Sequence, residues 1–159
     1  MRSLTIFVGG TLVGIFIQQA IAQNNNPGVI QLNHVGVAVE NVAESIEFYT
    51  QTLGFEEAFR VDGDDGQLRL AYLRVSDTTF VELAPANAER PAGLTHFGIH
   101  VDDVAAAKAM FEARGASATD VFTGFTKASL SNIFDPQGVQ IELSEYPPDS
   151  LQGQALAGR

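Results

Sequence analysis

Two histidines and two glutamates recur at matching places in two similar stretches of the sequence. His96 follows His34 by 62 residues, and Glu142 follows Glu82 by 60 residues. A duplicated unit with one His and one Glu at equivalent positions offers four ligands with approximate two-fold symmetry. Imidazole and carboxylate donors of this kind bind Zn, Ni, Co, Mn or Fe(II), and one or two coordination positions remain for water or substrate. The repeat therefore predicts one divalent metal site held by His34, Glu82, His96 and Glu142.

Strand periodicity places these four residues on one side of a sheet. Side chains alternate faces along a strand, so Val35 and Val37 share one face while His34 shares the other with small residues. The side chains around His96 alternate in the same way, and each glutamate is also expected on the strand face opposite its apolar neighbours. Branched rows suit packing under a helix, so the His rows face away from the helices and their small residues leave room for a ligand. A carboxylate on such an inner face is costly unless it meets a cation or a good donor.

The elements around these residues repeat in the same order. In the first copy we expect strands at 30–39, 55–61, 67–75 and 78–84, with a helix after the first strand that Asn41 caps and that runs to Leu53. In the second we expect strands at 94–101, 116–122, 127–134 and 139–145, with a helix at 104–114 that Asp102 caps. The prediction is an α+β fold: two tandem βαβββ modules, 29–84 and 93–145, form a curved mixed sheet around a central cup, with helices outside. The modules could pair within one chain or across a two-fold axis in a homodimer.

The two ends of the chain have different compositions. Leu4 to Ile17 carries no charge, and small residues precede Ala22, so residues 1–22 are expected to be a signal peptide cleaved after Ala22. The domain is then exported, periplasmic or secreted; the alternative is an N-terminal membrane anchor, because Leu4 to Ala22 could just span a bilayer. Residues 23–28 resemble a linker. The tail at 146–159 has no clear period and is expected to pack as an arm or to be disordered.

Composition limits the possible partners and chemistry. Removal of 22 of the 159 residues leaves one domain of 137 residues, whose net charge changes from −10 to −11 because Arg2 is lost. This charge repels phosphate backbones, so we expect a small-molecule partner and no nucleic acid. The chain has no cysteine, so it has no disulfide, no thiolate ligand and no cysteine nucleophile. Any metal must be held by imidazole, carboxylate and water.

Three further residues are candidates for the surroundings of the cup. His100 shares a face with His96 but has no counterpart in the first repeat, where Ala38 stands. It either supports the metal ligands or lines the pocket wall, or it is an ordinary hydrogen-bonded core histidine. Arg69 and Lys127 are the cations with the best reach into the cup from the third strand of each module.

These motifs resemble the vicinal oxygen chelate superfamily of glyoxalases, bleomycin resistance proteins and extradiol dioxygenases, over about Leu32 to Glu145. The resemblance is carried by Leu32-Asn33-His34-Val35-Gly36-Val37-Ala38-Val39, by Leu94-Thr95-His96-Phe97-Gly98-Ile99-His100-Val101, and by Phe134-Asp135-Pro136-Gln137-Gly138-Val139-Gln140-Ile141-Glu142-Leu143. Glyoxalase I and methylmalonyl-CoA epimerase are the members most similar in pattern. The resemblance implies a lactoylglutathione lyase-like lyase or isomerase that acts on a small α-oxygenated carbonyl compound through a metal-bound enediolate. It also implies that Glu142 is the base and Glu82 its symmetry-related partner.

Two departures from the family pattern leave the substrate open. Glyoxalase I of the bacterial type has an arginine and an asparagine that grip glutathione, and Ala38 and Ala86 stand at those places. One alternative function is an extradiol-type dioxygenase, in which His34, His96 and Glu142 hold Fe(II) and His100 assists. Another is an exported binding protein that sequesters an antibiotic or a metabolite without chemistry.

Overall fold

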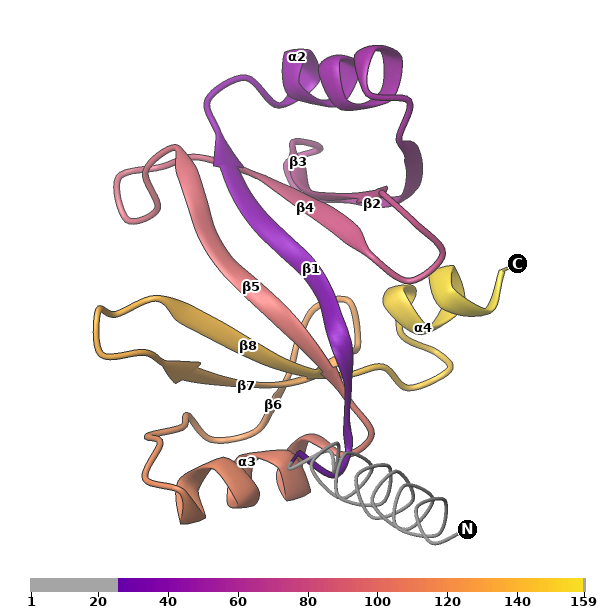
Figure 1. The fold of residues 1–159 in the computed structure, drawn as a ribbon. Coiled ribbons are helices and arrows are strands. Elements are labelled where there is room, and N and C mark those ends of the chain that lie inside the picture. Colours follow the sequence, from indigo (N-terminus) through magenta and orange to yellow (C-terminus); the bar gives the residue numbers. More distant parts are fainter. Residues whose placement is uncertain (1–25, 159) are drawn as a thin grey trace, which may run out of the picture.

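The computed structural model describes residues 26–158, which form two copies of a strand–helix–three-strand unit and a C-terminal helix (Figure 1). The first copy contains β1 (Val29–Val39), α2 (Val42–Glu47), the π-helical turn η1 (Phe48–Thr52), β2 (Glu56–Asp62), β3 (Leu68–Arg74) and β4 (Phe80–Pro85). The second contains β5 (Gly93–Val101), α3 (Val104–Ala113), β6 (Phe122–Thr123), β7 (Ser129–Phe134) and β8 (Gln140–Glu145). The last helix is α4 (Leu151–Ala157). The expected α+β fold class is confirmed.

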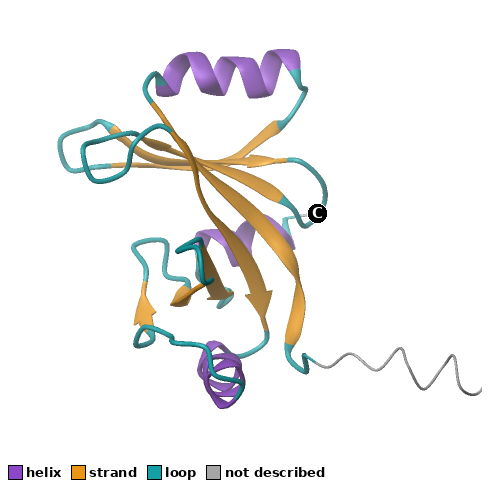
Figure 2. Cartoon of the chain, turned by 60° about the vertical axis from the view of Figure 1, so that its left-hand side comes forward, coloured by secondary structure: helices purple, strands orange, loops and turns teal. Residues whose placement is uncertain are grey.

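All eight strands join one curved sheet in the order β2-β3-β4-β1-β5-β8-β7-β6. β1 runs parallel to β4 and antiparallel to β5, and β5 runs parallel to β8. The two repeats thus meet through β1 and β5 within one chain, which is one of the two pairings that the sequence allows; the other, across a two-fold axis in a homodimer, stays a prediction. Figures 1 and 2 show α2 and α3 at opposite ends of the curled sheet, one on the outer side of each repeat.

Each repeat buries its outer row of side chains under its own helix. In the first repeat, Leu73 and Leu83 are fully buried and pack with Val37, Val39 and Ile46. The second repeat builds the equivalent cluster from Val101, Val104, Ala107, Ile133 and Leu143. This packing confirms that the apolar rows face the helices. The rows that carry the histidines and glutamates are therefore left on the inner face of the sheet.

The helices differ from the prediction in two details. Asn41 caps the first helix as expected, but the last turn widens into η1, where the Leu53 N–H donates to the carbonyl of Phe48, five residues back. In the second repeat, the cap is Asp103, whose side chain accepts a hydrogen bond from within the first helical turn. The prediction of Asp102 was wrong because the residue directly before the helix has the extended backbone that a cap requires.

The strands of the second repeat are shorter than predicted. The strand expected at 116–122 is reduced to one bridge between Ala118 and Ile133 and to the two-residue β6. Hydrogen bonds of Thr119 take the place of regular strand pairing, because its backbone and its hydroxyl group both hydrogen-bond to β7. The strand expected to begin at Lys127 starts at Ser129, since Lys127 lies in a turn with a φ of 67°.

The C-terminal tail forms α4, which no periodicity in the sequence indicates. Ser150 caps this helix, because its Oγ accepts a hydrogen bond from the Gly153 N–H at 3.0 Å. On its inner side, Ala155 and Leu156 pack against a cluster on the inner face of the first repeat. That cluster consists of Leu70, Tyr72 and Phe80. α4 therefore covers part of the inner face of β3 and β4.

The N-terminal segment, for which a signal peptide or an anchor is expected, lies outside the described residues. Within residues 26–158, no helix has the length and hydropathy needed to cross a membrane. The linker expected at 23–28 is described only from Asn26, where a turn leads into β1.

Candidate metal site

The two histidine rings meet across the pairing of β1 with β5. His34 is in register with Gly98, and His96 with Gly36, so each ring lies over a glycine of the other repeat. A Cβ added at either glycine would lie well under 3.0 Å from the ring above it. The two Nε2 atoms are 3.0 Å apart. The small residues that were expected to leave room for a ligand therefore make room for the rings themselves.

The two glutamates flank the rings from either side. Glu82 on β4 is in register with Gly36, and Glu142 on β8 is in register with Gly98. Glu82 Oε2 lies 3.9 Å and Glu142 Oε1 lies 3.6 Å from His34 Nε2. Ligand atoms of His34, Glu82 and His96 all lie within 4.8 Å of one another. The structure thus brings the four residues named from the sequence to one place, with His34 at its centre.

Burial shifts the protonation of all four groups. Burial, assisted by the neighbouring His96, lowers the pKa of His34 to about 3, and burial with the charge of Arg90 lowers the pKa of His96 to about 4. Burial and the nearby Glu142 raise the pKa of Glu82 to about 8. Burial also raises the pKa of Glu142, although a hydrogen bond from Ser144 opposes the shift. Near neutral pH, the site therefore holds two neutral imidazoles and two carboxyl groups that resist ionisation without a cation.

This donor set fits a divalent metal ion. Neutral imidazole nitrogens with free lone pairs are the form in which histidine binds metals, and hard carboxylate oxygens complete a mixed N/O set. Two buried carboxyl groups close together are stabilised as anions only by positive charge. Among the described residues, the only cation whose charge lowers the pKa of Glu82 is Arg90, and that effect is the smallest of the four causes. A His-Glu-His cluster at this place could hold an ion, and Glu142 stands close enough to be a fourth ligand.

A buried hydrogen-bond network fixes the orientation of the His34 ring. The Asn33 side chain donates through Nδ2 to the Thr78 carbonyl at 2.8 Å, so its Oδ1 is the acceptor that faces His34 Nδ1 at 3.2 Å. The Tyr146 hydroxyl donates to the same Oδ1 at 2.8 Å. His34 Nδ1 therefore carries the proton, and the lone pair of Nε2 points into the site. On the other ring, the Thr95 hydroxyl lies 2.9 Å from His96 Nδ1.

We expect an Asn33→Leu variant to bind a divalent ion about 10- to 100-fold more weakly than the wild type. The substitution removes the acceptor that sets the tautomer of His34, and such supporting contacts carry effects of this size. Titration with Zn²⁺ against a competing chelator measures the affinity. Gln31→Leu is the matched control, because Gln31 also donates to the Thr78 carbonyl but is only partly buried and makes no hydrogen bond to His34. Equal affinities in the two variants would contradict the role of Asn33.

We also expect the metal-free protein to lose stability as the pH rises from about 6.5 to about 8. In this window, Glu82 is protonated in the folded state, where its pKa is about 8, and ionised in the unfolded state, where the pKa is near 4.5. The folded state therefore holds the extra proton, and linkage predicts a loss of about 1 to 2 kcal/mol. The lowered pKa values of the two histidines make stability rise with pH, but this opposite effect is confined to pH values below about 6.5.

Thermal unfolding in the presence of a chelator tests this pH dependence. The wild-type midpoint should fall across the window, and the Glu82→Gln midpoint should fall less, because the amide does not titrate. A wild-type midpoint that rises with pH would show that Glu82 is not held in its neutral form.

A cavity of about 230 Å³ lies beside the two glutamates. Glu82 and Glu142 form part of its wall, and most of the other wall residues come from the second repeat and the C-terminal helix. The other lining residues include Phe122, Phe125, Leu130, Asn132, Gln140 and Gln152. The cavity wall therefore combines apolar and aromatic side chains with carboxyl and amide groups.

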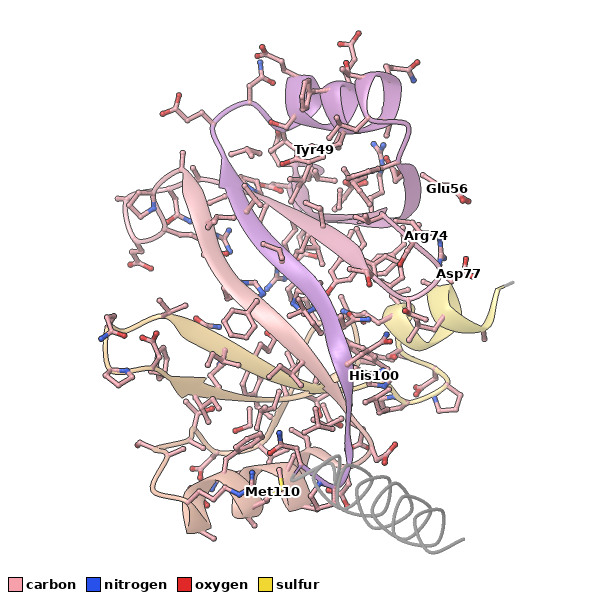
Figure 3. All side chains as sticks on the ribbon, in the orientation of Figure 1. Tyr49, Glu56, Arg74, Asp77, His100 and Met110 are labelled. Atoms are coloured by element: carbon pink, nitrogen blue, oxygen red, sulfur yellow. The ribbon has the colours of Figure 1, made fainter. Side chains whose placement is uncertain are left out.

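The remaining candidates from the sequence lie around this cavity in different ways. The Arg69 guanidinium lies over the ring of Phe125, 4.0 Å from its centroid, so this expected cation packs against a residue of the cavity wall but does not line the cavity itself. Lys127 instead pairs with Asp149 at 3.3 Å on the surface. The His100 ring, whose position Figure 3 labels, packs against that of Tyr146, with centroids 4.6 Å apart. His100 thus contacts the metal-ligand network through Tyr146, and a direct role for it stays a prediction.

Comparisons with known proteins agree with this arrangement. The family model for the Glyoxalase/Bleomycin resistance protein/Dioxygenase superfamily matches residues 31–143. The uncharacterized protein YaeR of Escherichia coli (strain K12) is 29% identical over 126 residues, which cover 74% of this chain and 98% of YaeR.

Solved structures show the same fold. Methylmalonyl-CoA epimerase from Mycobacterium tuberculosis is 26% identical, with a TM-score of 0.67 over 81% of this chain and 96% of the epimerase. A variant of the Streptomyces coelicolor methylmalonyl-CoA epimerase in complex with 2-nitronate-propionyl-CoA is 22% identical, with a TM-score of 0.65 over 77% of this chain and 98% of that one. The family match covers both repeats and all four candidate ligands, so the chain belongs to the Glyoxalase/Bleomycin resistance protein/Dioxygenase superfamily, as the resemblance in its motifs predicted.

Proposed function

We propose that this protein is a metal-dependent lyase or isomerase, similar to glyoxalase I, that acts on a small α-oxygenated carbonyl compound. One observation carries the proposal: two neutral imidazoles and two largely buried carboxyl groups, one imidazole and one carboxyl group from each repeat, converge, and the two carboxyl groups line a cavity. The residues that would hold the ion are His34, Glu82, His96 and Glu142. The ion would be Zn, Ni, Co, Mn or Fe(II), since all accept this donor set.

A bound divalent ion supplies positive charge that polarises two adjacent oxygens of a substrate and acidifies the neighbouring C–H group. The chain itself supplies the proton carriers. Glu142 is the proposed base: Ser144 donates a hydrogen bond to its Oε1 at 2.9 Å, which fixes the carboxylate beside the cavity. Burial raises its pKa above that of an exposed carboxyl group, which makes the carboxylate a stronger base. Glu82 faces the same cavity from the other repeat and is the proposed partner for the second proton transfer.

The fourth donor favours this chemistry over that of a dioxygenase. Extradiol-type chemistry needs open metal positions for both oxygen and substrate. Glu82 stands 3.9 Å from His34 Nε2, on the same side as the other ligand atoms, where it would fill one of those positions. A substrate that brings two adjacent oxygens to the remaining positions satisfies the set without a separate oxygen site.

Elemental analysis of protein purified without chelator tests the proposal first. We expect about one divalent ion per chain in the wild type and a loss of more than about 100-fold in affinity in the His34→Ala/His96→Ala double variant, which lacks both imidazoles. The loaded protein should then catalyse deuterium incorporation into hydroxyacetone or glycolaldehyde in D₂O, followed by NMR. A loaded wild type that exchanges no faster than the double variant would overturn the lyase or isomerase assignment. A wild type that binds no metal after reconstitution would favour the binding-protein alternative.

A further inference from the structure

The C-terminal helix contributes a buried amide to the cavity. Gln152 of α4 is only 5% exposed, and it lines the cavity together with Glu82 and Glu142. Its Oε1 has no hydrogen-bond partner among the described residues. A buried carbonyl oxygen without a donor is unfavourable, and native proteins rarely keep one unless something in the site satisfies it. Because Gln152 lines the cavity, a molecule bound there is the candidate donor for this oxygen.

The contacts of α4 hold this amide in one orientation. The Gln152 side chain hydrogen-bonds to Tyr72, and because Oε1 has no partner, the amide nitrogen is the end that donates to the tyrosine. Tyr72 in turn hydrogen-bonds to Glu82. The Leu151 N–H donates to the Thr126 carbonyl at 3.0 Å, at the start of the helix.

A second contact secures the far end of the helix. Arg74 donates through Nη1 to the Asp77 carbonyl at 3.1 Å and through Nη2 to the Ala155 carbonyl at 2.6 Å, and it stands between β3 and α4 (Figure 3). The helix is thus anchored on both sides of Gln152, so the position of the amide is set by the fold.

α4 also makes the two halves of the cup unequal. It packs on the inner face of the first repeat, so the cavity is lined mainly by the second repeat, through Phe122, Phe125, Leu130, Asn132 and Gln140. The open volume of about 230 Å³ suits a compact molecule. A substrate in this half would lie between the aromatic wall and the free oxygen of Gln152.

We propose that Gln152 is a specificity-determining residue, which selects compact molecules that carry a hydroxyl or N–H donor beside their two metal-binding oxygens. This inference rests on the proposed function and adds to it a substrate class, small and donor-bearing. The aromatic residues of the cavity wall exclude bulky molecules. Gln152 Oε1 disfavours analogues without the donor, because binding them would leave this buried oxygen unpaired.

Two small hydroxamates test the inference by binding alone. Acetohydroxamate offers two adjacent oxygens and an N–H group, and N-methylacetohydroxamate lacks the N–H. Their affinities for the Co²⁺-loaded full chain are measured by calorimetry and by the cobalt absorption band. The measured quantity is the ratio of the affinity for acetohydroxamate to that for N-methylacetohydroxamate. We expect this ratio to be about 5- to 10-fold higher in the wild type than in Gln152→Leu, because one buried hydrogen bond has an effect of this size. Gln154→Leu is the matched control, because Gln154 lies on the same helix and is exposed.

The outcomes separate the two proposals. A wild type that binds no cobalt overturns the proposed function and this inference with it. Cobalt binding with the same hydroxamate preference in Gln152→Leu and Gln154→Leu overturns the inference alone. So does a Gln152→Leu variant that keeps cobalt but loses both hydroxamates equally, because that result indicates a displaced helix. Gln152→Met, of nearly the same shape, repeats the test if the leucine variant is poorly folded.

Discussion

Replacement of Glu142 by glutamine is expected to slow deuterium exchange into hydroxyacetone by about 100- to 10,000-fold, the usual contribution of a positioned general base. The amide keeps the shape of the side chain and its oxygen still accepts the hydrogen bond from Ser144, but it cannot take up a proton. The raised pKa of Glu142, which follows from burial, is the property that the amide removes. NMR in D₂O with the metal-loaded variant gives the rate.

Metal content must be measured in the same samples, because Glu142 is also a proposed ligand. A variant that keeps at least half of its metal but loses exchange supports a role in proton transfer, whereas parallel loss of both indicates a ligand only. Glu112→Gln is a suitable control, since Glu112 is an exposed acid that pairs with Lys108 on α3. Full exchange activity in Glu142→Gln would remove Glu142 from the proposed mechanism.

The second large effect is expected at Gly98. An alanine there would place its Cβ well under 3.0 Å from three atoms of the His34 ring, which is fully buried. The ring has no free space to move into, so we expect a loss of about 3 kcal/mol in unfolding free energy, at the upper end of ordinary overpacking. Displacement of Nε2 should also weaken metal binding more than about 100-fold, beyond the effect of losing a supporting contact.

A double-mutant cycle identifies the cause. In a His34→Ala background the ring is absent, so the added methyl group of Gly98→Ala meets no clash and should cost less than about 1 kcal/mol. Chemical denaturation of the four metal-free proteins measures the coupling. Additive losses would show that Gly98 is needed for its backbone and not for its contact with the ring.

The convergence of the four proposed ligands could be predicted because alternation in a strand is set by backbone geometry. The sequence period alone places His34 and Glu82 opposite their apolar neighbours, and the repeat does the same for His96 and Glu142. Asn33 was missed for the same reason: strict alternation sends it to the other face. The pairing of β1 with β5 shifts register between Leu32 and His34, and this irregularity lets adjacent side chains share one network.

The residues from the tail could not be predicted from local pattern. Tyr146 and Gln152 follow the last strand in a segment without a period, and only the packing of α4 against the first repeat brings them to the site. Tyr72 resembles an ordinary core aromatic, because it lies in a buried strand. Its hydrogen bonds to polar side chains become visible only once β3 and α4 are placed together.

The crossed placement of rings over glycines has a consequence for folding. Every ring–glycine contact joins β1 to β5, whose histidines are 62 residues apart in the chain. Neither repeat alone carries more than one imidazole and one carboxylate of the set, so an ion has no complete site to nucleate around in a half-formed chain. Long-range pairing of this kind is slow to form. Metal capture should thus mark the end of folding, and a nascent chain should stay metal-free until its second repeat has been made.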